Sequence, residues 1–155
     1  SHAAFAETVL LGLQPRGIFF ADRIQQRLAK ILDKKIDKGY LDTTFHRDDF
    51  RRRDSPLTPS KTDVPFLIED KNVILLDDVL YTGRSVRAAL DAMVTFGRPR
   101  KVELMVLIDR KYTRHLPIEP DYVGLAVNTI DSQRVLVEWK EPNSEDGVWL
   151  TSKSN

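Results

Sequence analysis

The sequence of 155 residues contains no cysteine, which excludes several kinds of chemistry at once. Disulfides, thiolate metal sites and thiol nucleophiles cannot form. The chain also has no uninterrupted apolar run of about 18 residues, so no membrane-spanning helix is predicted. Its first residues do not follow the basic-then-apolar order of a secretory signal. We therefore expect a soluble protein of the cytoplasm, the default compartment for a cysteine-free enzyme.

An excess of charge of one sign is also missing. The formal net charge is +1, although 30% of the residues are charged. Such a balance gives no overall basic surface for nucleic acid. Basic residues nevertheless gather in residues 47–61 and again in residues 98–114. Each cluster is open to two interpretations, a solvated surface or an anion-binding site, and a nearby phosphate site would favour the second.

Length and composition predict one folded domain over residues 3–150. Strands are expected at residues 7–13, 39–45, 72–76, 102–108, 123–127 and 134–139. An amphipathic helix is predicted at residues 18–34, and a second helix follows Ser85 and ends near Gly97. This alternation predicts the α/β class, with a central, mainly parallel sheet flanked by helices. A doubly wound sheet usually has more chain before its first strand, so we expect an N-terminal helix to be absent from this sequence.

Residues 47–63 form a long segment of a different kind. They include Arg51, Arg52 and Arg53 and two prolines, with few apolar residues. A loop of this length inside a compact domain is usually disordered or functional. Because a predicted strand follows it directly, a flexible flap over an active site is favoured over a linker between domains.

Residues 73–85, VILLDDVLYTGRS, combine an apolar strand, an acidic pair and a glycine-containing helix start. The strand would deliver Asp77 and Asp78 to the carboxyl edge of the sheet, where open α/β sheets bind ligands. Two vicinal ribose hydroxyls are suitable donors to such carboxylates. The following Thr82 and Gly83 let a phosphate approach a helix N-terminus. The stretch therefore predicts a site for ribose 5-phosphate.

Other interpretations of the stretch explain less. The aspartates could end a strand while the next residues merely begin a helix, but the complete string in this context argues against coincidence. A receiver-type acidic pocket would account for Asp77 and Asp78 without accounting for the phosphate-binding loop.

These residues resemble the signature of type I phosphoribosyltransferases. Three strings, DDVLYTGRSVRAALDAM, LDTTFHRDDF and VLIDRKYTRHLPIEPDYVG, resemble more specifically the family of pyrimidine-operon attenuators that double as uracil phosphoribosyltransferases. The likeness runs from about Leu10 to about Trp139. It implies a hood at about residues 109–122 and a flap at about residues 47–63. It also implies that uracil and 5-phosphoribosyl diphosphate are converted to UMP and diphosphate with Mg²⁺ and without a protein nucleophile.

The resemblance assigns roles to individual residues. Asp77 and Asp78 would hold the ribose hydroxyls and, indirectly, Mg²⁺, and with Arg16 they are the expected catalytic residues. The expected phosphate ligands are Thr82, Gly83, Arg84 and Ser85 for the 5-phosphate, and Arg16 and Gly17 for the diphosphate. Asp109 and Arg110 would begin the base-binding region, although an ordinary turn at a strand end is the other interpretation of these two residues.

The chain departs from the family pattern at Pro15 and His46. Pro15 stands where the family usually has threonine, and proline removes an N–H donor and a hydroxyl from the diphosphate loop. His46 stands where tyrosine is common, and packing or surface exposure is favoured over catalysis. Trp139 and Trp149 are expected to pack in the core or the tail rather than to stack on a base.

The resemblance implies two activities and several partners. UMP or UTP would occupy the same site and increase affinity for pyrimidine-operon leader RNA, a coupling between two sites. A homodimer or larger homo-oligomer and no contact with membranes are expected. Two alternatives stay open: a catalytically weak regulator that senses nucleotides and binds RNA, and a phosphoribosyltransferase for another base.

Overall fold

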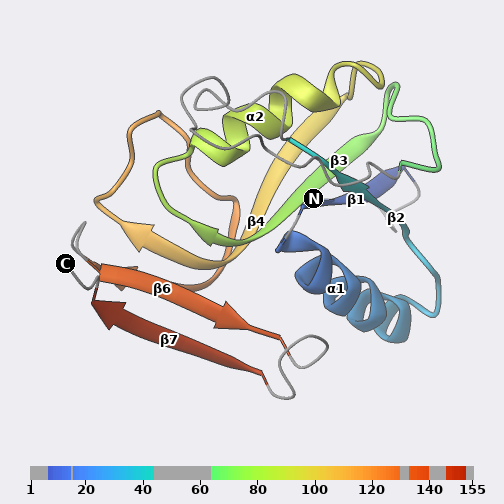
Figure 1. Ribbon diagram of the computed structural model, residues 1–155. Helices are drawn as coiled ribbons and strands as arrows, with labels where there is room; N and C mark the ends of the chain where they lie inside the picture. The colour runs from blue at the N-terminus through green and yellow to red at the C-terminus, as the bar shows by residue number, and fades with distance from the viewer. Residues whose placement is uncertain (1–6, 15, 44–63, 130–132, 140–145, 153–155) are drawn as a thin grey trace.

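The computed structural model describes residues 7–14, 16–43, 64–129, 133–139 and 146–152. The two helices follow the first and third strands, and strands alone follow the second helix (Figure 1). In chain order the elements are β1 (Thr8–Leu13), α1 (Gly17–Leu32), β2 (Asp37–Leu41), β3 (Asn72–Leu80), α2 (Arg84–Met93), β4 (Lys101–Lys111), β5 (Tyr122–Asn128), β6 (Gln133–Glu138) and β7 (Gly147–Ser152).

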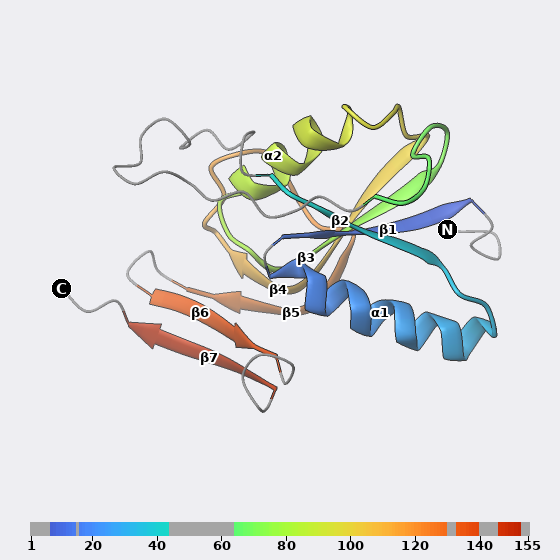
Figure 2. The same cartoon turned by 45° about the vertical axis from the view of Figure 1, so that its right-hand side comes forward.

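A five-stranded sheet in the order β2-β1-β3-β4-β5 forms the centre of the molecule. All four neighbouring pairs in it are parallel. Helix α2 lies on one face, and α1 lies on the other (Figures 1 and 2). The predicted α/β class with a parallel sheet is therefore confirmed.

The order of the strands creates a switch point between β1 and β3. From β1 the chain turns to one side to form β2, and it then crosses back to form β3 on the other side of β1. Connections that leave two neighbouring strands in opposite directions open a crevice at their carboxyl ends, where ligands bind in open α/β sheets. The fold alone thus points to the ends of β1 and β3.

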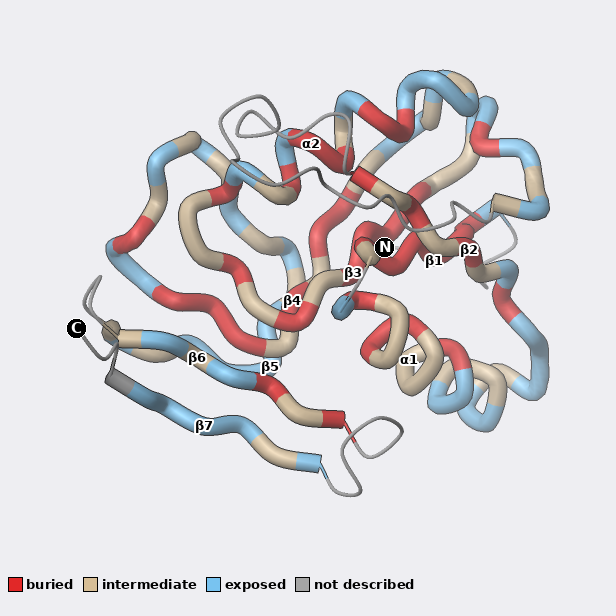
Figure 3. Tube along the Cα trace, viewed as in Figure 1, coloured by how far each residue is buried: buried red, intermediate tan, exposed pale blue. Residues whose placement is uncertain are grey.

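Residues 73–76 of β3 are all apolar, as a strand segment covered on both faces requires. Successive side chains of a strand point to opposite faces. Accordingly, Val73 and Leu75 pack in the cluster that contains the apolar residues of α2, whereas Ile74 and Leu76 pack in the cluster that contains those of α1. The tube in Figure 3 is red along the middle of β1 and β3 for this reason.

The chain ends in an antiparallel hairpin of β6 and β7, which forms a separate two-stranded sheet on the side of α1 (Figure 2). The hairpin is attached through Trp139, which is buried and stacks on Phe20 with ring centroids 6.1 Å apart. Arg23 of α1 also donates to Asp146 at 2.9 Å. Trp139 therefore packs in the core as expected, while Trp149 lies on β7 with 48% of its surface exposed.

The sequence pattern misplaced three features. Strand β2 ends at Leu41, several residues earlier than predicted, and β7 was not predicted at all. Strand β3 continues to Leu80, because its pairing with β4 includes Val79 opposite Ile108. The acidic pair thus lies within the strand and not after it.

Other predictions lie outside the described residues. These are the flap at 47–63 and the departures at Pro15 and His46. No described helix is long and apolar enough to cross a membrane.

Candidate functional site

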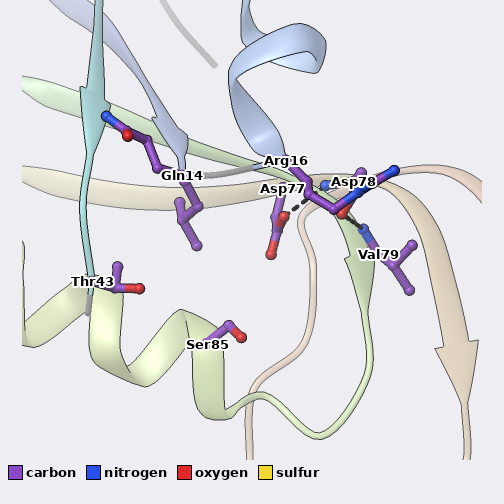
Figure 4. A pocket seen from close by; sticks show the side chains of 8 residues that line it. Gln14, Arg16, Thr43, Asp77, Asp78, Val79 and Ser85 are labelled. Carbon is purple, nitrogen blue, oxygen red and sulfur yellow. Dashed lines mark hydrogen bonds and ion pairs between the residues drawn. The ribbon is translucent and has the colours of Figure 1, made fainter. Parts of the chain in front are cut away.

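A pocket of about 210 Å³ lies at the carboxyl ends of β1, β2 and β3, facing the first turn of α2 (Figure 4). This is the switch point of the sheet. The side chains that line it are Leu13, Gln14, Arg16, Thr43, Asp77, Asp78, Val79 and Ser85. Four of the residues expected to bind 5-phosphoribosyl diphosphate, Arg16, Asp77, Asp78 and Ser85, are thereby brought together although they are far apart in sequence.

The two aspartates have different surroundings. Asp78 is only 6% exposed, and its two oxygens accept from the backbone N–H of Val79 at 2.8 Å and from Nε of Arg16 at 3.1 Å. Asp77 accepts from the N–H of Asp78 with Oδ1, at 2.8 Å. Figure 4 shows the Asp77 side chain pointing from β3 toward Ser85 in the first turn of α2. Asp78 is thus the fixed member of the pair, and Asp77 presents its carboxylate to the pocket.

Arg16 brings a cation to the rim of the pocket. Besides Asp78, it binds the carbonyl oxygen of Val137 in β6 through Nη2. Its side chain is 47% exposed, so a ligand can reach it from solvent. The guanidinium therefore joins the acidic pair to the terminal hairpin and lies where an anionic ligand would meet it.

Gly17 begins α1 and is buried. A Cβ at this position would lie 2.5 Å from the carbonyl oxygen of Leu76, closer than real atoms approach. Glycine is therefore required for the helix to start against the backbone of β3. The sequence interpretation gave Gly17 a role in approaching diphosphate and missed this contact with the neighbouring strand.

Residues 81–83, named the phosphate loop below, connect β3 to α2. Gly83 is the N-cap of α2 with φ 92°, a left-handed conformation that favours glycine. No side chain caps the helix at Gly83, and Oγ1 of Thr82 accepts from the N–H of Arg84 at 3.3 Å. Ser85, in the first turn of α2, lines the pocket, whereas Thr82, Gly83 and Arg84 are not among its lining residues. The N-terminus of a helix beside a pocket favours a phosphate.

Asp109 and Arg110, the expected start of the base site, do not line this pocket. Asp109 is 4% exposed and forms an ion pair with Arg114. Arg110 is 6% exposed; it donates from Nε to Thr129 at 2.8 Å and lies 4.0 Å from the ring centroid of Tyr81. Both charged groups are therefore already engaged. Asp109 lines a second hollow of about 190 Å³ together with Lys111, Tyr112, Arg114 and Glu119.

Sequence reasoning missed Thr43 in the pocket wall. The residue is only 5% exposed and follows β2, which pairs in parallel with β1. Its position two residues beyond the end of a strand was the available signal, but the predicted strand extended past it.

The described residues contain no group of three or more acidic, histidine or cysteine side chains that could hold a metal by themselves. Mg²⁺ commonly binds through one or two carboxylates together with substrate phosphates and water. Asp77 and Asp78 fit this mode, in which the ion arrives with a diphosphate, and they do not form a complete protein cage.

Comparison with known proteins gives one consistent family. Residues 1–142 match the phosphoribosyl transferase domain family. A protein of Enterococcus faecalis named bifunctional protein PyrR is 46% identical over 149 residues, which cover 96% of this chain and 82% of that protein. Its namesake from Desulfosudis oleivorans is 44% identical over 147 residues, covering 95% of this chain and 81% of the relative.

Solved structures of hypoxanthine phosphoribosyltransferases have a similar fold. The Trypanosoma cruzi structure has a TM-score of 0.67 at 16% identity and matches 95% of this chain and 77% of its own. The Staphylococcus aureus structure has a TM-score of 0.59 at 19% identity, and the match spans 79% of this chain but only 63% of that protein. At such identities the likeness concerns the fold alone.

Proposed function

Because the chain belongs to the phosphoribosyltransferase family, and within it to the group of bifunctional PyrR proteins, we propose that it transfers ribose 5-phosphate from 5-phosphoribosyl diphosphate to uracil. The products are UMP and diphosphate. The observation that carries the proposal is the pocket at the switch point, where Arg16, Asp77 and the first turn of α2 surround a space of about 210 Å³. The three groups match the diphosphate, the sugar hydroxyls and the 5-phosphate in charge and hydrogen bonding.

In this arrangement the protein orients the substrate and does not bond to it covalently. Asp77 accepts hydrogen bonds from the ribose hydroxyls, while the helix N-terminus after Gly83 holds the 5-phosphate. Asp78 fixes Arg16 through their contact at 3.1 Å. Holding the reacting groups in place converts a bimolecular encounter into an effectively unimolecular step, a large share of many enzymatic rate enhancements.

Cleavage of the bond between C1 and the diphosphate creates an oxocarbenium-like centre, as in other glycosyl transfers. Carboxylates near the sugar stabilise its positive charge, and the guanidinium of Arg16 stabilises the departing anion. Asp77 and Asp78 are the residues that would hold Mg²⁺, and the ion would supply further charge neutralisation of the leaving group. We assign residues 47–63 to a flap that excludes water from this centre.

The proposal has a regulatory half. UMP or UTP in the same pocket would increase affinity for pyrimidine-operon leader RNA and so attenuate transcription. The two relatives, which are 44% and 46% identical to this chain, are both named bifunctional protein PyrR. This name supports a second activity beside transfer. The proposal includes a cytoplasmic location. It also includes a homodimer or larger homo-oligomer, and light scattering coupled to size exclusion would test this oligomeric state.

An assay with uracil, orotate, hypoxanthine and guanine tests the enzymatic half. Each base is supplied with 5-phosphoribosyl diphosphate and Mg²⁺, and nucleotide formation is followed by chromatography. Preference for uracil is expected. Nucleotide from another base alone would move the assignment to that base, and no nucleotide from any base would refute transfer and favour a sensing role.

Titration of a pyrimidine-operon leader transcript tests the regulatory half. Binding is measured with and without UMP at several salt concentrations, because phosphate contacts make affinity depend on salt. Tighter binding with UMP, and discrimination against a scrambled transcript, are expected. Binding that ignores both UMP and RNA sequence would refute specific attenuation.

A further inference from the structure

The guanidinium of Arg114 joins parts of the chain that surround the candidate site. Its side chain is only 14% exposed. It binds the carboxylate of Asp109 through Nη2, and it donates to the carbonyl oxygens of Tyr81 at 2.7 Å, Ile118 at 2.8 Å and Arg110 at 3.2 Å. Three backbone segments, the phosphate loop, the end of β4 and the connection to β5, therefore meet at one cation.

Residues of the segment after β4 form several hydrogen bonds with the backbone of the phosphate loop. The carbonyl oxygen of Thr82 accepts from the N–H groups of His115 at 2.9 Å and Leu116 at 3.2 Å. Oγ1 of Thr113 lies 3.2 Å from the carbonyl oxygen of Tyr81 and 2.6 Å from that of Arg110, and its single proton is shared between the two. Because buried carbonyl groups need partners, the segment that contains Arg114 fixes the direction of these peptide groups. The loop is thus shaped by a neighbouring segment that the sequence interpretation assigned to base recognition.

The ring of Tyr81 is fixed as well as its carbonyl group. Arg110 lies 4.0 Å from the ring centroid, a favourable distance for a cation–π contact. Arg114 donates a hydrogen bond from Nη1 to the carbonyl oxygen of Tyr81. Tyr81 is two residues before Gly83, the N-cap of α2. Because Tyr81 lies in the loop that leads into α2, we expect its orientation to affect the position of the first turn of that helix.

We propose that Arg114 is a positioning residue for the 5-phosphate site, acting through the carbonyl oxygen of Tyr81 and without touching the ligand. The inference rests on the proposed function in one respect, that the phosphate loop and the first turn of α2 receive the 5-phosphate. It adds that Asp109 serves to hold Arg114 in place. Phosphate affinity thereby depends on the segment after β4.

The substitution Arg114→Lys tests this role. Lysine keeps a cation for Asp109, but a single ammonium group cannot reproduce the planar fork that reaches three carbonyl oxygens. The probes are ribose 5-phosphate and inorganic diphosphate, each titrated by calorimetry, because they separate the 5-phosphate site from the region of Arg16. We expect about tenfold weaker binding of ribose 5-phosphate, the loss of roughly one charge-assisted hydrogen bond, with unchanged binding of diphosphate.

A matched control is Arg100→Lys. Arg100 also forms a two-bond pair, with Asp70 at 3.2 Å and 3.1 Å, but it is exposed and precedes β4, away from the carboxyl edge of the sheet. This control should bind both ligands as the unmodified protein does. In steady-state assays, Arg114→Lys should raise the KM for 5-phosphoribosyl diphosphate by more than it lowers kcat, whereas the control should change neither.

The outcomes separate this inference from the proposed function. If the unmodified protein binds neither ribose 5-phosphate nor diphosphate, the proposed function fails. If it binds both, and Arg114→Lys binds both equally well or loses both equally, the positioning role is refuted. Should Arg114→Lys not fold, Asp109→Asn decides: it keeps the shape of the side chain and removes the charge that holds Arg114. A loss of binding confined to ribose 5-phosphate supports the inference, while no such loss overturns it.

Discussion

Replacing Asp77 by asparagine should weaken sugar binding and leave the fold nearly unchanged. Asparagine retains Oδ1, which can still accept from the N–H of Asp78 at 2.8 Å. What the change removes is the negative charge and the second oxygen of a side chain that points into the pocket (Figure 4). A hydrogen bond to a charged group contributes about 1.5–3 kcal/mol, so ribose 5-phosphate should bind roughly tenfold to a hundredfold more weakly.

The matched variant is Asp78→Asn, which should affect stability as well. One oxygen keeps the N–H of Val79, but the new amide group faces Nε of Arg16, so two donors meet where an ion pair stood at 3.1 Å. Because the Arg16 side chain is 47% exposed, solvent screens much of that pair. The expected cost is about 1 kcal/mol of unfolding free energy, with weaker binding of diphosphate as Arg16 loses its anchor.

Two measurements on both variants check this reasoning. Calorimetry with ribose 5-phosphate and with diphosphate gives the two affinities, and urea denaturation gives the free energy of unfolding. Asp77→Asn should lose affinity for ribose 5-phosphate alone, whereas Asp78→Asn should lose affinity for diphosphate and part of its stability. Unchanged affinity of Asp77→Asn would mean that the sugar does not lie beside Asp77. Equal losses of stability in the two variants would refute the assignment of their hydrogen bonds.

Three further changes have defined outcomes. Gly17→Ala places a Cβ 2.5 Å from the carbonyl oxygen of Leu76, so we expect about 1–3 kcal/mol of destabilisation in urea denaturation; an unaltered midpoint would contradict the contact. The hydroxyl of Tyr122 donates to Glu103 at 2.8 Å, and this bond raises the pKa of Tyr122 above its ordinary 10.0. The stability that the bond contributes is present below that pH and is lost as the pH rises through the raised pKa. Tyr122→Phe should therefore be less stable by about 1 kcal/mol near neutral pH, and the difference should shrink in thermal melts above pH 10; a constant difference would argue against the bond. Chelation of Mg²⁺ should stop nucleotide formation and spare the binding of ribose 5-phosphate, which lacks the diphosphate; equal loss of both would place the ion elsewhere.

Local sequence patterns were sufficient to predict that the strands and helices that carry the site exist, although not where each one ends. Residues 73–76 are apolar without a break, as a strand covered on both faces requires, and they lie in β3. Phe20 and Ile24 recur at helical spacing and pack toward the sheet from α1. Once the strands are parallel, their carboxyl ends must share one edge. The approximate place of the pocket therefore followed from local patterns and one topological rule.

Contacts between distant parts of the chain were not predictable in the same way. Thr43 enters the pocket wall because β2 pairs with β1, a register that its own neighbours in sequence do not specify. Asp109 and Arg110 were identified as polar residues at a strand end, but their partners, Arg114 and Thr129, are set by folding of the later chain. The residue types of Asp109 and Arg110 indicated that they could bind a ligand. Packing of the later chain decided that both are instead bound by other protein groups.

The bond from Arg16 to Val137 connects the pocket to a part of the chain that carries a buried tryptophan. Val137 lies two residues before Trp139, a buried tryptophan stacked on Phe20 at 6.1 Å. A ligand that draws the guanidinium toward itself would alter the surroundings of this indole. The chain has two tryptophans, so Trp149→Phe leaves Trp139 as the single tryptophan, which can be excited selectively at wavelengths where tyrosine does not absorb. Occupancy of the pocket could then be followed in real time through the protein's own emission, without an attached dye.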